Sequence, residues 1–517
     1  MIGDAGGQRK TGNTAVATEI ELKLRVSPAR LREVLALPLL TAAHGAVTRK
    51  LAATYFDTPA LALSQQRIAL RVRREGRRWV QAVKGGGSAV SGVHQRLEIE
   101  TVLRDRHPDL SRLPRHPVTR ILQSKKVAKS LVPVLHTEIT RTLRMLEPAP
   151  GVLIEAAIDR GVIRSGRRRA PVCEIELELK SGPVSALFEL AQQLAQAVPL
   201  ALEHRSKAER GYELFRGAAA PPAKAVPVVL SREMTAGQAF HAMAVATLAQ
   251  AQANEGGVIA SPDPEYLHQM RVGIRRLRSV FRLFRDLLGD AAAPQAAALR
   301  TIAGALGPAR DWDVFVTETL PAVRPVLAAH VAADVFERLC LGAQRMARTK
   351  AKKSIKTITY NESMIQLGGW LATFASAGSD PAWQQPARAC ATQILSACHD
   401  RVLKRGRRLE RRTAAELHRL RIAVKQLRYA TEFFSSLYSA RGMATLRDRL
   451  ALLQDILGRI NDAATVRQLL GAAAENREVI AATGMVIGWC EAHAVAERNT
   501  LPLAWRRFRA VRRPWQD

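Results

Sequence analysis

Two segments far apart in the chain alternate charged and apolar side chains, and this pattern constrains the fold more than any other feature. One covers residues 19–23 (EIELK) and the other covers residues 174–180 (EIELELK). Successive side chains of a β-strand point to opposite faces, so each segment would form a strand with one charged and one apolar face. Shorter matches lie at residues 71–73 and 96–100. The pattern predicts a β barrel with an ionic interior, in which carboxylates would hold metal and cations would hold an anionic substrate.

Length and charge restrict the class of protein and of partner. The chain has 517 residues, too many for one compact core, so we expect two or three domains. Its net charge is +32 and its pI is about 11.0, and basic residues are in excess both before and after residue 217. This excess indicates a polyanionic partner, namely nucleic acid, anionic lipid or polyphosphate. A basic, solvated surface without such a partner is the alternative.

Cysteine usage and hydropathy indicate the compartment. The five cysteines are scattered and form no CxxC pair, which disfavours a disulfide framework or a zinc site and fits a reducing compartment. The first 18 residues lack the apolar segment of a signal peptide, and no apolar run reaches the roughly 20 residues of a membrane helix. We therefore expect a cytoplasmic protein with no membrane partner.

The chain changes character near residue 217. The part before it is rich in strand-like runs, a Pro- and Ala-rich stretch follows, and apolar residues then recur with a period of 3.6 almost to the end. We predict an α+β multidomain protein with an antiparallel β domain followed by an all-α domain. The expected limits are residues 1–17 for a disordered tail, 18–216 for the β domain, 217–230 for a linker and 231–517 for the helical domain.

The helical part contains a duplication with an offset of 150 residues. The segment HQMRVGIRRLR, which begins at His268, matches HRLRIAVKQLR, which begins at His418. Further matching positions follow each segment at nearly the same offset. We predict two related helical bundles, at about 231–345 and 385–500, packed about a pseudo-two-fold axis.

Each copy gathers cations on one helix face. At about 100° per residue, positions i, i+3, i+7 and i+10 fall within an arc of about 80°, with Met270 and Ile274 on the opposite face. Cations at this spacing repel one another, which favours an anion that bridges them, and guanidinium groups fit phosphate oxygens. A solvated helix face is the alternative, and the duplication argues against it. The predicted polyanion-binding residues are a first stripe of His268, Arg271, Arg275 and Arg278 and a second stripe of His418, Arg421, Lys425 and Arg428.

The two copies differ at positions beside the stripes. Arg282 extends the first stripe, whereas Glu432 stands at the corresponding position of the second copy. Asn461 stands where the first copy has Arg310. We expect each leading histidine to donate to phosphate or to be held by a carboxylate such as Asp311 or Asp462.

The helical half resembles a CHAD domain. The resemblance rests on the His268 segment, the repeat and the Arg310-Asp311 turn, and it covers about residues 231–517. It implies a duplicated helical-bundle domain that binds inorganic polyphosphate through a basic surface or a central pore, with the two stripes as binding residues. Polyphosphate granules are a further expected partner and location.

The β half resembles the CYTH superfamily of triphosphate tunnel metalloenzymes. The pattern Glu19-x-Glu21-x-Lys23 is the ExExK signature of that superfamily. The resemblance covers roughly residues 18–216 and implies an antiparallel eight-stranded β tunnel that hydrolyses a triphosphate. The order of the two domains is similar to that of CYTH–CHAD inorganic triphosphatases. The supporting segments lie at residues 55–59, 70–73, 79–84, 98–100, 159–161, 174–178 and 206–212.

The expected tunnel residues are cations and carboxylates. Triphosphate binding needs cations on several walls, and its hydrolysis needs a divalent ion, for which oxygen ligands favour Mg²⁺ or Mn²⁺. We assign catalytic roles to Glu19, Glu21 and Lys23. The predicted triphosphate-binding residues are Lys23, Arg71, Arg73, Lys84, Arg96, Arg141 and Lys207. The predicted metal ligands are Glu19, Glu21, Glu98, Glu100, Asp159, Glu176 and Glu178.

These residues predict a metal-dependent inorganic triphosphatase that hydrolyses tripolyphosphate in the tunnel and binds inorganic polyphosphate with its helical domain. By the resemblance, one metal would clamp the phosphates and a second would position the water that attacks the terminal phosphorus. One alternative is a non-catalytic protein of polyphosphate granules. Others are a hydrolase of nucleoside or thiamine triphosphates and a class IV-type adenylate cyclase. Nucleic-acid binding is disfavoured, since no helix-turn-helix, zinc-finger or aromatic stacking pattern occurs.

Overall fold

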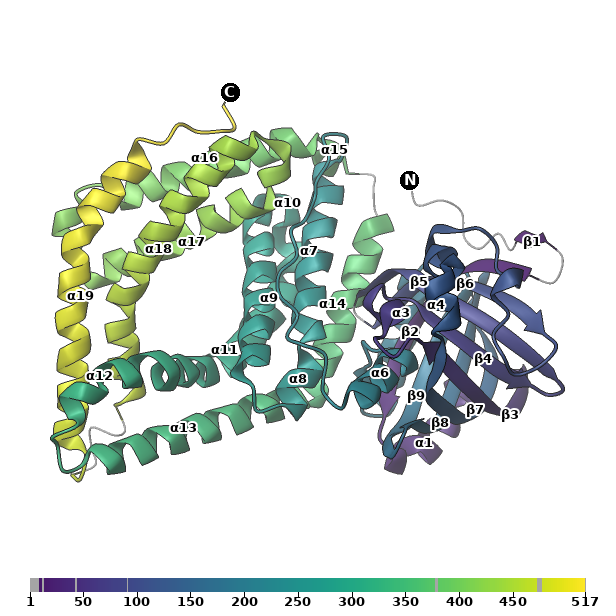
Figure 1. Cartoon of the computed structure of the whole chain (residues 1–517). Helices are drawn as coiled ribbons and strands as arrows, with labels where there is room; N and C mark the ends of the chain where they lie inside the picture. The colour runs from purple at the N-terminus through teal and green to yellow at the C-terminus, as the bar shows by residue number, and fades with distance from the viewer. Residues whose placement is uncertain are drawn as a thin grey trace. The chain divides into compact units, whose positions relative to one another are not determined.

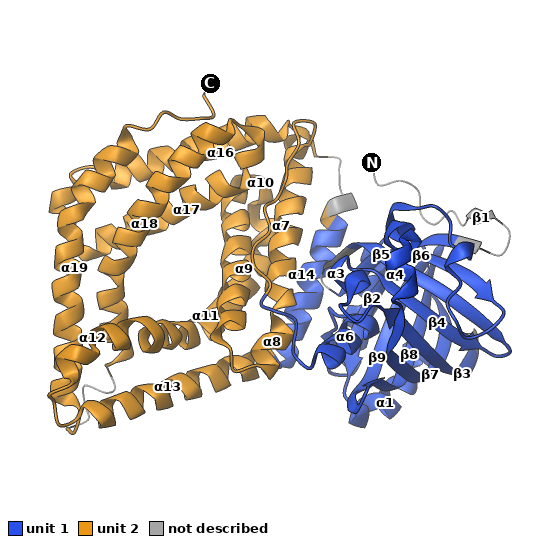
Figure 2. Cartoon of the chain, viewed as in Figure 1, with its two compact units in different colours: residues 1–222, 356–373 blue, residues 223–355, 374–517 orange. Residues whose placement is uncertain are grey.

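The computed structural model describes residues 9–11, 14–41, 44–90, 92–376, 380–471 and 477–516. These residues form two compact units, coloured separately in Figure 2. The first unit comprises residues 1–222 and 356–373, and the second comprises residues 223–355 and 374–517. All the named strands lie in the first unit, and the second is helical (Figure 1). Among the described helices, none combines the length and apolarity that a membrane span requires.

Eight antiparallel strands of the first unit close into a barrel. The strand order is β2-β6-β5-β4-β3-β7-β8-β9, and the pairing of β9 with β2 closes the ring. This arrangement confirms the predicted eight-stranded antiparallel barrel. The short strands β1 (Arg9–Thr11) and β10 (Leu200–Leu202) add to β2 outside the ring. The ring strands are β2 (Thr14–Val26), β3 (His44–Asp57), β4 (Ala69–Glu75), β5 (Arg78–Val90), β6 (Val93–Leu103), β7 (Val132–Ala149), β8 (Val152–Ser165) and β9 (Arg168–Ser181).

The apolar face of the barrel wall packs outward against short helices. Leu70, Val72, Val83 and Ile99 form a core with apolar residues of the helical segments that follow β6. Alternation along each strand therefore sends the charged side chains inward. The helices of this unit are α1 (Leu31–Leu35), α2 (Pro38–Thr41), α3 (Ala62–Gln65), α4 (Lys125–Lys129), α5 (Ser185–Ala197), α6 (Lys207–Arg216) and most of α14 (Ile358–Ser376), with 3-10 turns at Pro28–Arg30, Leu110–Arg112 and Pro117–Gln123.

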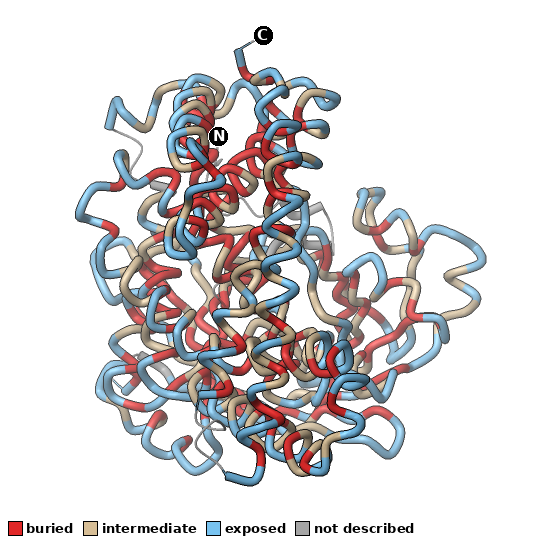
Figure 3. The backbone as a smooth tube through the Cα atoms, turned by 90° about the vertical axis from the view of Figure 1, so that its left-hand side faces the viewer, coloured by how far each residue is buried: buried red, intermediate tan, exposed pale blue. Residues whose placement is uncertain are grey.

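The two repeats of the second unit follow the same packing order. In the first repeat, α7 packs on α9, α9 on α11 and α11 on α13, and in the second, α16 packs on α17, α17 on α18 and α18 on α19. Buried and exposed stretches alternate along these helices, as amphipathic packing requires (Figure 3). The helices are α7 (Ala236–Ala253), α8 (Glu255–Ala260), α9 (Pro264–Leu283), α10 (Arg285–Leu288), α11 (Ala293–Val314), α12 (Leu320–Leu327), α13 (Ala333–Ser354), α15 (Pro381–Gln384), α16 (Ala387–Arg405), α17 (Ala414–Phe433), α18 (Ala440–Leu469) and α19 (Ile480–Arg509), with a π-helical turn at Phe315–Thr319 and 3-10 turns at Gly289–Ala292, Leu409–Arg411 and Ser435–Leu437.

A symmetric pair of contacts joins α9 to α17. Arg276, which is 2% exposed, places Nη2 2.7 Å from Oε1 of Glu432. Arg282 donates from Nη1 to Oε1 of Gln426 over 3.1 Å. Residues 426 and 432 are the counterparts of residues 276 and 282 at the 150-residue offset, so one contact is the pseudo-two-fold image of the other.

The predicted domain limits remain predictions, and the compact units differ from them in two places. Residues 356–373 group with the barrel, where Gly369 of α14 lies against Phe188 of α5 at a distance that leaves little room for a larger side chain. Part of the predicted linker is hydrogen-bonded to the helical unit, since the amide of Ala223 donates to Oδ1 of Asn254 over 3.0 Å.

A close approach between β7 and β8 generates a prediction about stability. A Cβ atom at Gly161 would lie 2.0 Å from the carbonyl oxygen of Glu138 on the paired strand, so neither strand can accommodate it without moving. We expect Gly161→Ala to lower the free energy of unfolding by about 1–3 kcal/mol, measured by denaturant unfolding. The control is Gly304→Ala in α11, where nothing lies within 4 Å of the added methyl, and it should stabilise the helix by up to about 1 kcal/mol. Equal effects of the two substitutions would contradict this account.

Candidate functional site

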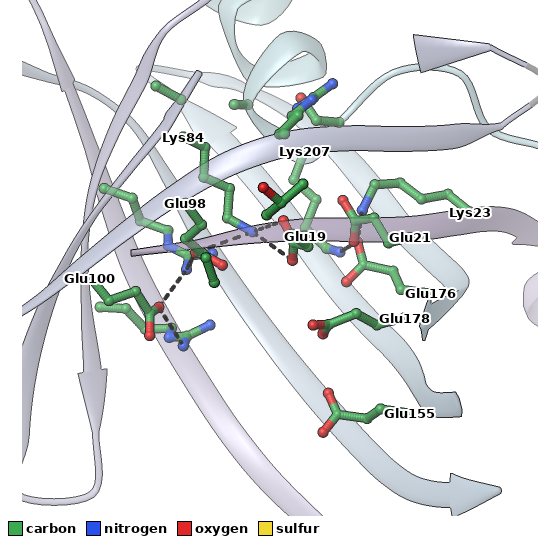
Figure 4. A pocket seen from close by; sticks show the side chains of 18 of the residues that line it. Glu19, Glu21, Lys23, Lys84, Glu98, Glu100, Glu155, Glu176, Glu178 and Lys207 are labelled. Carbon is green, nitrogen blue, oxygen red and sulfur yellow. Dashed lines mark hydrogen bonds and ion pairs between the residues drawn. The ribbon is translucent and has the colours of Figure 1, made fainter. Parts of the chain in front are cut away.

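The barrel encloses a cavity of about 310 Å³ whose wall is charged. Figure 4 shows carboxylates and ammonium groups from several strands pointing toward one another in this space. The charged residues of the wall are Glu19, Glu21, Lys23, Arg71, Arg73, Lys84, Arg96, Glu98, Glu100, Arg141, Glu155, Glu176, Glu178, Lys180 and Lys207. The cavity therefore brings together every predicted triphosphate-binding residue and every predicted metal ligand except Asp159.

Lys84 lies at the centre of one group of ion pairs. Its Nζ is 2.6 Å from Oε2 of Glu19 and 3.2 Å from Oε1 of Glu98. Arg71 approaches Glu98 at 3.3 Å and Glu100 at 3.7 Å. Burial opposes the charge of Glu19, but Lys84 and Lys23 outweigh it and lower the pKa of Glu19 to about 2. This carboxylate is thus ionised and neutralised by lysine. Arg73 joins the same group through Glu100, at 3.7 Å.

Lys207, at the start of α6, lies at the centre of a second group. Its Nζ is 2.7 Å from Asp159, 2.5 Å from Glu174 and 2.9 Å from Glu176. Carboxylate oxygens of these three acids lie within 4.8 Å of one another, which is compatible with a metal site, but here they surround the ammonium group of Lys207. Arg141 adds a bidentate pair to Asp159 at 2.7 and 2.6 Å.

Asp159 is fully buried behind this group and does not line the cavity. Its contacts are to Arg141 and Lys207, so it fixes two cations in place. The same parity that predicted Asp159 also puts Glu155 on the inner face of β8, because the two lie four residues apart. Glu155 and Lys180 are not among the predicted site residues, although Glu155 lies in β8 and Lys180 ends the alternating segment of β9.

Glu155, Glu178 and Glu21 form a row of carboxylates across three strands. The register pairs Glu155 of β8 with Glu178 of β9, and Glu178 with Glu21 of β2. Figure 4 shows them along one side of the cavity. Lys180 lies 2.5 Å from Glu178 and 3.9 Å from Glu155, and Lys23 lies 2.7 Å from Glu21. Like charges directly opposite in a sheet are unfavourable, so this carboxylate row suits a cation better than an empty cavity.

Burial raises the pKa of carboxylates in this row as it does at Glu19, but here the neighbouring lysines do not outweigh it. It raises the pKa of Glu21, against the charge of Lys23, and raises the pKa of Glu178, against Lys180. Glu21 and Glu178 therefore retain protons more readily than an exposed carboxylate does. In the described part of the chain, the oxygen atoms of the row's three carboxylates have only Lys23 and Lys180 beside them. Carboxylate oxygens are hard ligands, which favour Mg²⁺ or Mn²⁺.

The helical unit places the two predicted stripes on neighbouring helices, α9 and α17. Met270 and Ile274 are buried on the opposite face of α9, as predicted. Arg275 donates from Nε to the hydroxyl of Tyr429 on α17 over 2.6 Å. His418 pairs through Nδ1 with the amide oxygen of Asn461, rather than with the carboxylate of Asp462. The substitution that distinguishes the second copy at position 461 thus supplies the partner of its histidine.

Lys425 is the most strongly perturbed cation of the stripes. Burial, followed by the charges of Arg421 and Arg275, lowers its pKa to about 7, against the opposing effect of Asp462; Arg428 lowers it further. At neutral pH a large fraction of this amine is uncharged. A bound anion would restore its charge, which links anion binding to proton uptake.

Comparison with known proteins assigns both units. Residues 17–212 match the CYTH domain family, and residues 242–471 match the CHAD domain family. An inorganic triphosphatase from Haemophilus influenzae is 33% identical over 201 residues, which are 38% of this chain and 54% of the relative. The chain thus spans about half the length of that relative.

Two solved structures are also similar. The CHAD domain from the plant Ricinus communis is 32% identical with a TM-score of 0.52, and the match covers 57% of this chain and 98% of that one. A putative adenylyl cyclase from Hippeastrum with a dominant triphosphatase activity is 19% identical with a TM-score of 0.30, over 39% of this chain and 98% of that one. The chain therefore belongs to the CHAD family through its helical unit and carries a CYTH domain in front of it.

Proposed function

We propose that this protein is a metal-dependent inorganic triphosphatase that hydrolyses tripolyphosphate in the barrel and binds inorganic polyphosphate with its helical unit. The observation that carries the first part is the wall of the 310 Å³ cavity, where cations and carboxylates alternate inside a closed barrel. A pure anion-binding site needs cations alone. Carboxylates in the same cavity are explained by a divalent ion that accompanies the phosphates. Association with polyphosphate granules in the cytoplasm would follow from the second part.

The charged groups of the cavity have separable roles in this proposal. Lys84, Arg71 and Arg141 would bind phosphate oxygens and would exchange their present carboxylate partners for them. Glu21, Glu178 and Glu155 of the carboxylate row would hold the divalent ion, with Glu176 beside them. When bound, such an ion neutralises phosphate charge and lowers the pKa of a water molecule that can attack phosphorus. Asp159 would act through Arg141 and Lys207 as a positioning residue.

The triphosphatase proposal is tested by phosphate release. We expect purified protein to release phosphate from tripolyphosphate with Mg²⁺ or Mn²⁺ and not with EDTA. Glu21→Gln and Glu178→Gln should each lower kcat/KM by at least about a hundredfold, because each removes charge from the carboxylate row. Glu138→Gln is the matched control, since this carboxylate is 61% exposed and lies outside the cavity, and its kcat/KM should stay within about twofold of wild type.

The substrate panel separates the alternatives. ATP and thiamine triphosphate are tested beside tripolyphosphate, and cyclic AMP is measured as a second product of ATP. A preference for ATP, or formation of cyclic AMP, would refute an inorganic substrate. No release from any substrate, with tripolyphosphate still bound, would make the barrel a sensor rather than an enzyme.

The polyphosphate proposal is tested on the stripes. Arg271→Ala/Arg275→Ala removes two guanidinium groups, and we expect the affinity of the full chain for long-chain polyphosphate in EDTA to fall at least about tenfold. The slope of log K against log salt should shrink by about 0.7 for each lost phosphate contact. Arg345→Ala/Lys350→Ala on the exposed face of α13 is the control with the same change of charge. An equal loss in both variants would mean that only net charge matters.

Lys425 generates a prediction about pH. Its pKa of about 7 in the free protein rises when an anion binds, so binding takes up a proton above pH 7. Polyphosphate affinity should therefore fall as pH rises above 7, by up to about tenfold per pH unit until the pKa of the complex is reached. Lys425→Arg stays charged throughout and should flatten this profile, whereas Lys350→Arg should not. A profile with the same slope in Lys425→Arg would remove Lys425 as its cause.

A further inference from the structure

A second cavity lies in the helical unit where α16 ends and α17 begins. Its volume is about 590 Å³, and none of its lining residues belongs to the two stripes. Five of the seven lining side chains are cations. We call this group the basic cleft, which consists of Asp400, Arg401, Lys404, Arg405, Arg412, Glu416 and Arg419.

The loop beside the basic cleft has a fixed path. A Cβ atom at Gly406 would lie 2.1 Å from the ring of Trp505, so only glycine fits where α16 ends. Arg408 adopts the left-handed conformation with φ of 52°. Thr413 and Glu416 then form a capping box at the start of α17. The cations of the cleft are thus held on ordered backbone, which lowers the entropic cost of binding a ligand.

Both carboxylates of the cleft already have partners. Asp400 accepts from Nη2 of Arg513 over 2.7 Å. Glu416 is paired with Arg412, four residues earlier, and is also engaged in the capping box. Neither carboxylate is therefore available to neutralise the remaining cations of the cleft.

The remaining cations lack such partners. Arg405 uses Nη1 to donate to the backbone carbonyl of Arg419 over 2.7 Å. Among the residues that the structure describes, the side chains of Arg401, Lys404 and Arg419 form no ion pair, and all three are exposed. Burial and then the charges of Arg401 and Arg419 lower the pKa of Arg405, which reflects repulsion among these groups. An anion in the cleft would relieve that repulsion.

The basic cleft is connected to the first stripe through α17, because Arg282 donates to Gln426 of α17 over 3.1 Å and α17 packs on α16. Burial and then the charge of Arg282 lower the pKa of Arg278, and burial and then Arg401 lower the pKa of Arg282. Arg401 in turn acts on Arg405. The effects of these charges on one another agree with that connection between the end of α9 and the cleft on α16. Arg419 belongs to this path and not to the second stripe, because it lies about 200° around α17 from Arg421.

We propose that the basic cleft is a second anchoring site for inorganic polyphosphate, reached from the first stripe across Arg282 and Arg401. The ligand is a linear phosphate chain, whose oxygens match the guanidinium and ammonium groups at both sites. A chain long enough to occupy both sites binds more tightly than a short one without any change at either site, because the second contact is intramolecular. This inference rests on the proposed binding of polyphosphate by the stripes. It adds that the affinity for polyphosphate increases with the length of the phosphate chain.

The experiment compares four full-length proteins in EDTA, which prevents hydrolysis in the barrel. These are the wild type, Arg401→Ala/Lys404→Ala, Arg271→Ala/Arg275→Ala and the charge-matched control Arg345→Ala/Lys350→Ala. Their affinities are measured by calorimetry for polyphosphates of increasing chain length and for a single-stranded oligonucleotide. Thermal unfolding of each variant verifies that it is folded, which we expect because the substituted cleft residues are exposed.

The cleft variant should match the control on short chains and bind long chains about tenfold more weakly than the control does. A variant that follows the control at every chain length would overturn the proposal, as would a loss confined to the oligonucleotide. If Arg271→Ala/Arg275→Ala is weakened while the cleft variant is not, only this inference fails. If the wild type does not bind polyphosphate, both this inference and the proposed polyphosphate binding by the stripes fail.

Discussion

The enclosure of many charges in one closed barrel is the constraint on which the first unit depends. Pairing of β9 with β2 leaves no open edge, so the inward face of each strand must find its electrostatic partners inside. Buried charges are costly unless they are paired and hydrogen-bonded. Lys84 and Lys207 meet this requirement by each contacting more than one carboxylate. The interior is thus balanced in groups, and the three glutamates of the carboxylate row share two lysines, Lys23 and Lys180.

Charge in the helical unit is not balanced in this way. Its stripes and its basic cleft hold cations in excess, and the carboxylates beside the cleft are already engaged. Burial first, and then this excess of cations, lowers the pKa of Lys425. The barrel cavity thus mixes carboxylates with cations, whereas the stripes and the basic cleft of the helical unit are formed mainly by cations.

Sequence reasoning succeeded where a local period determines orientation. Strand parity placed Glu19, Glu21 and Lys23 on the inner wall, and helical periodicity placed Met270 on the buried face of α9. It failed where the answer depends on contacts between distant elements. Parity cannot reveal that Lys207, from a helix after the barrel, occupies the space between Asp159 and its neighbouring acids.

The helical unit shows the same division between local and distant information. The duplication was visible in the sequence, but the partner of His418 was not, because it comes from a different helix. The association of residues 356–373 with the barrel was also absent from the predicted limits, since nothing in their composition distinguishes this helix from those around it. In both cases the sequence does not reveal which helix surfaces contact each other in the folded protein.

The paired contacts between α9 and α17 bear on how such a duplication can persist. Two copies of the first repeat would set Arg276 against a second Arg282 at both crossings, and two copies of the second would set Gln426 against Glu432. Only the mixed pairing gives one Arg–Glu and one Arg–Gln contact. The mixed pairing avoids the Arg–Arg contacts that two copies of the first repeat would make, so we expect the first repeat to assemble with itself less well than with the second.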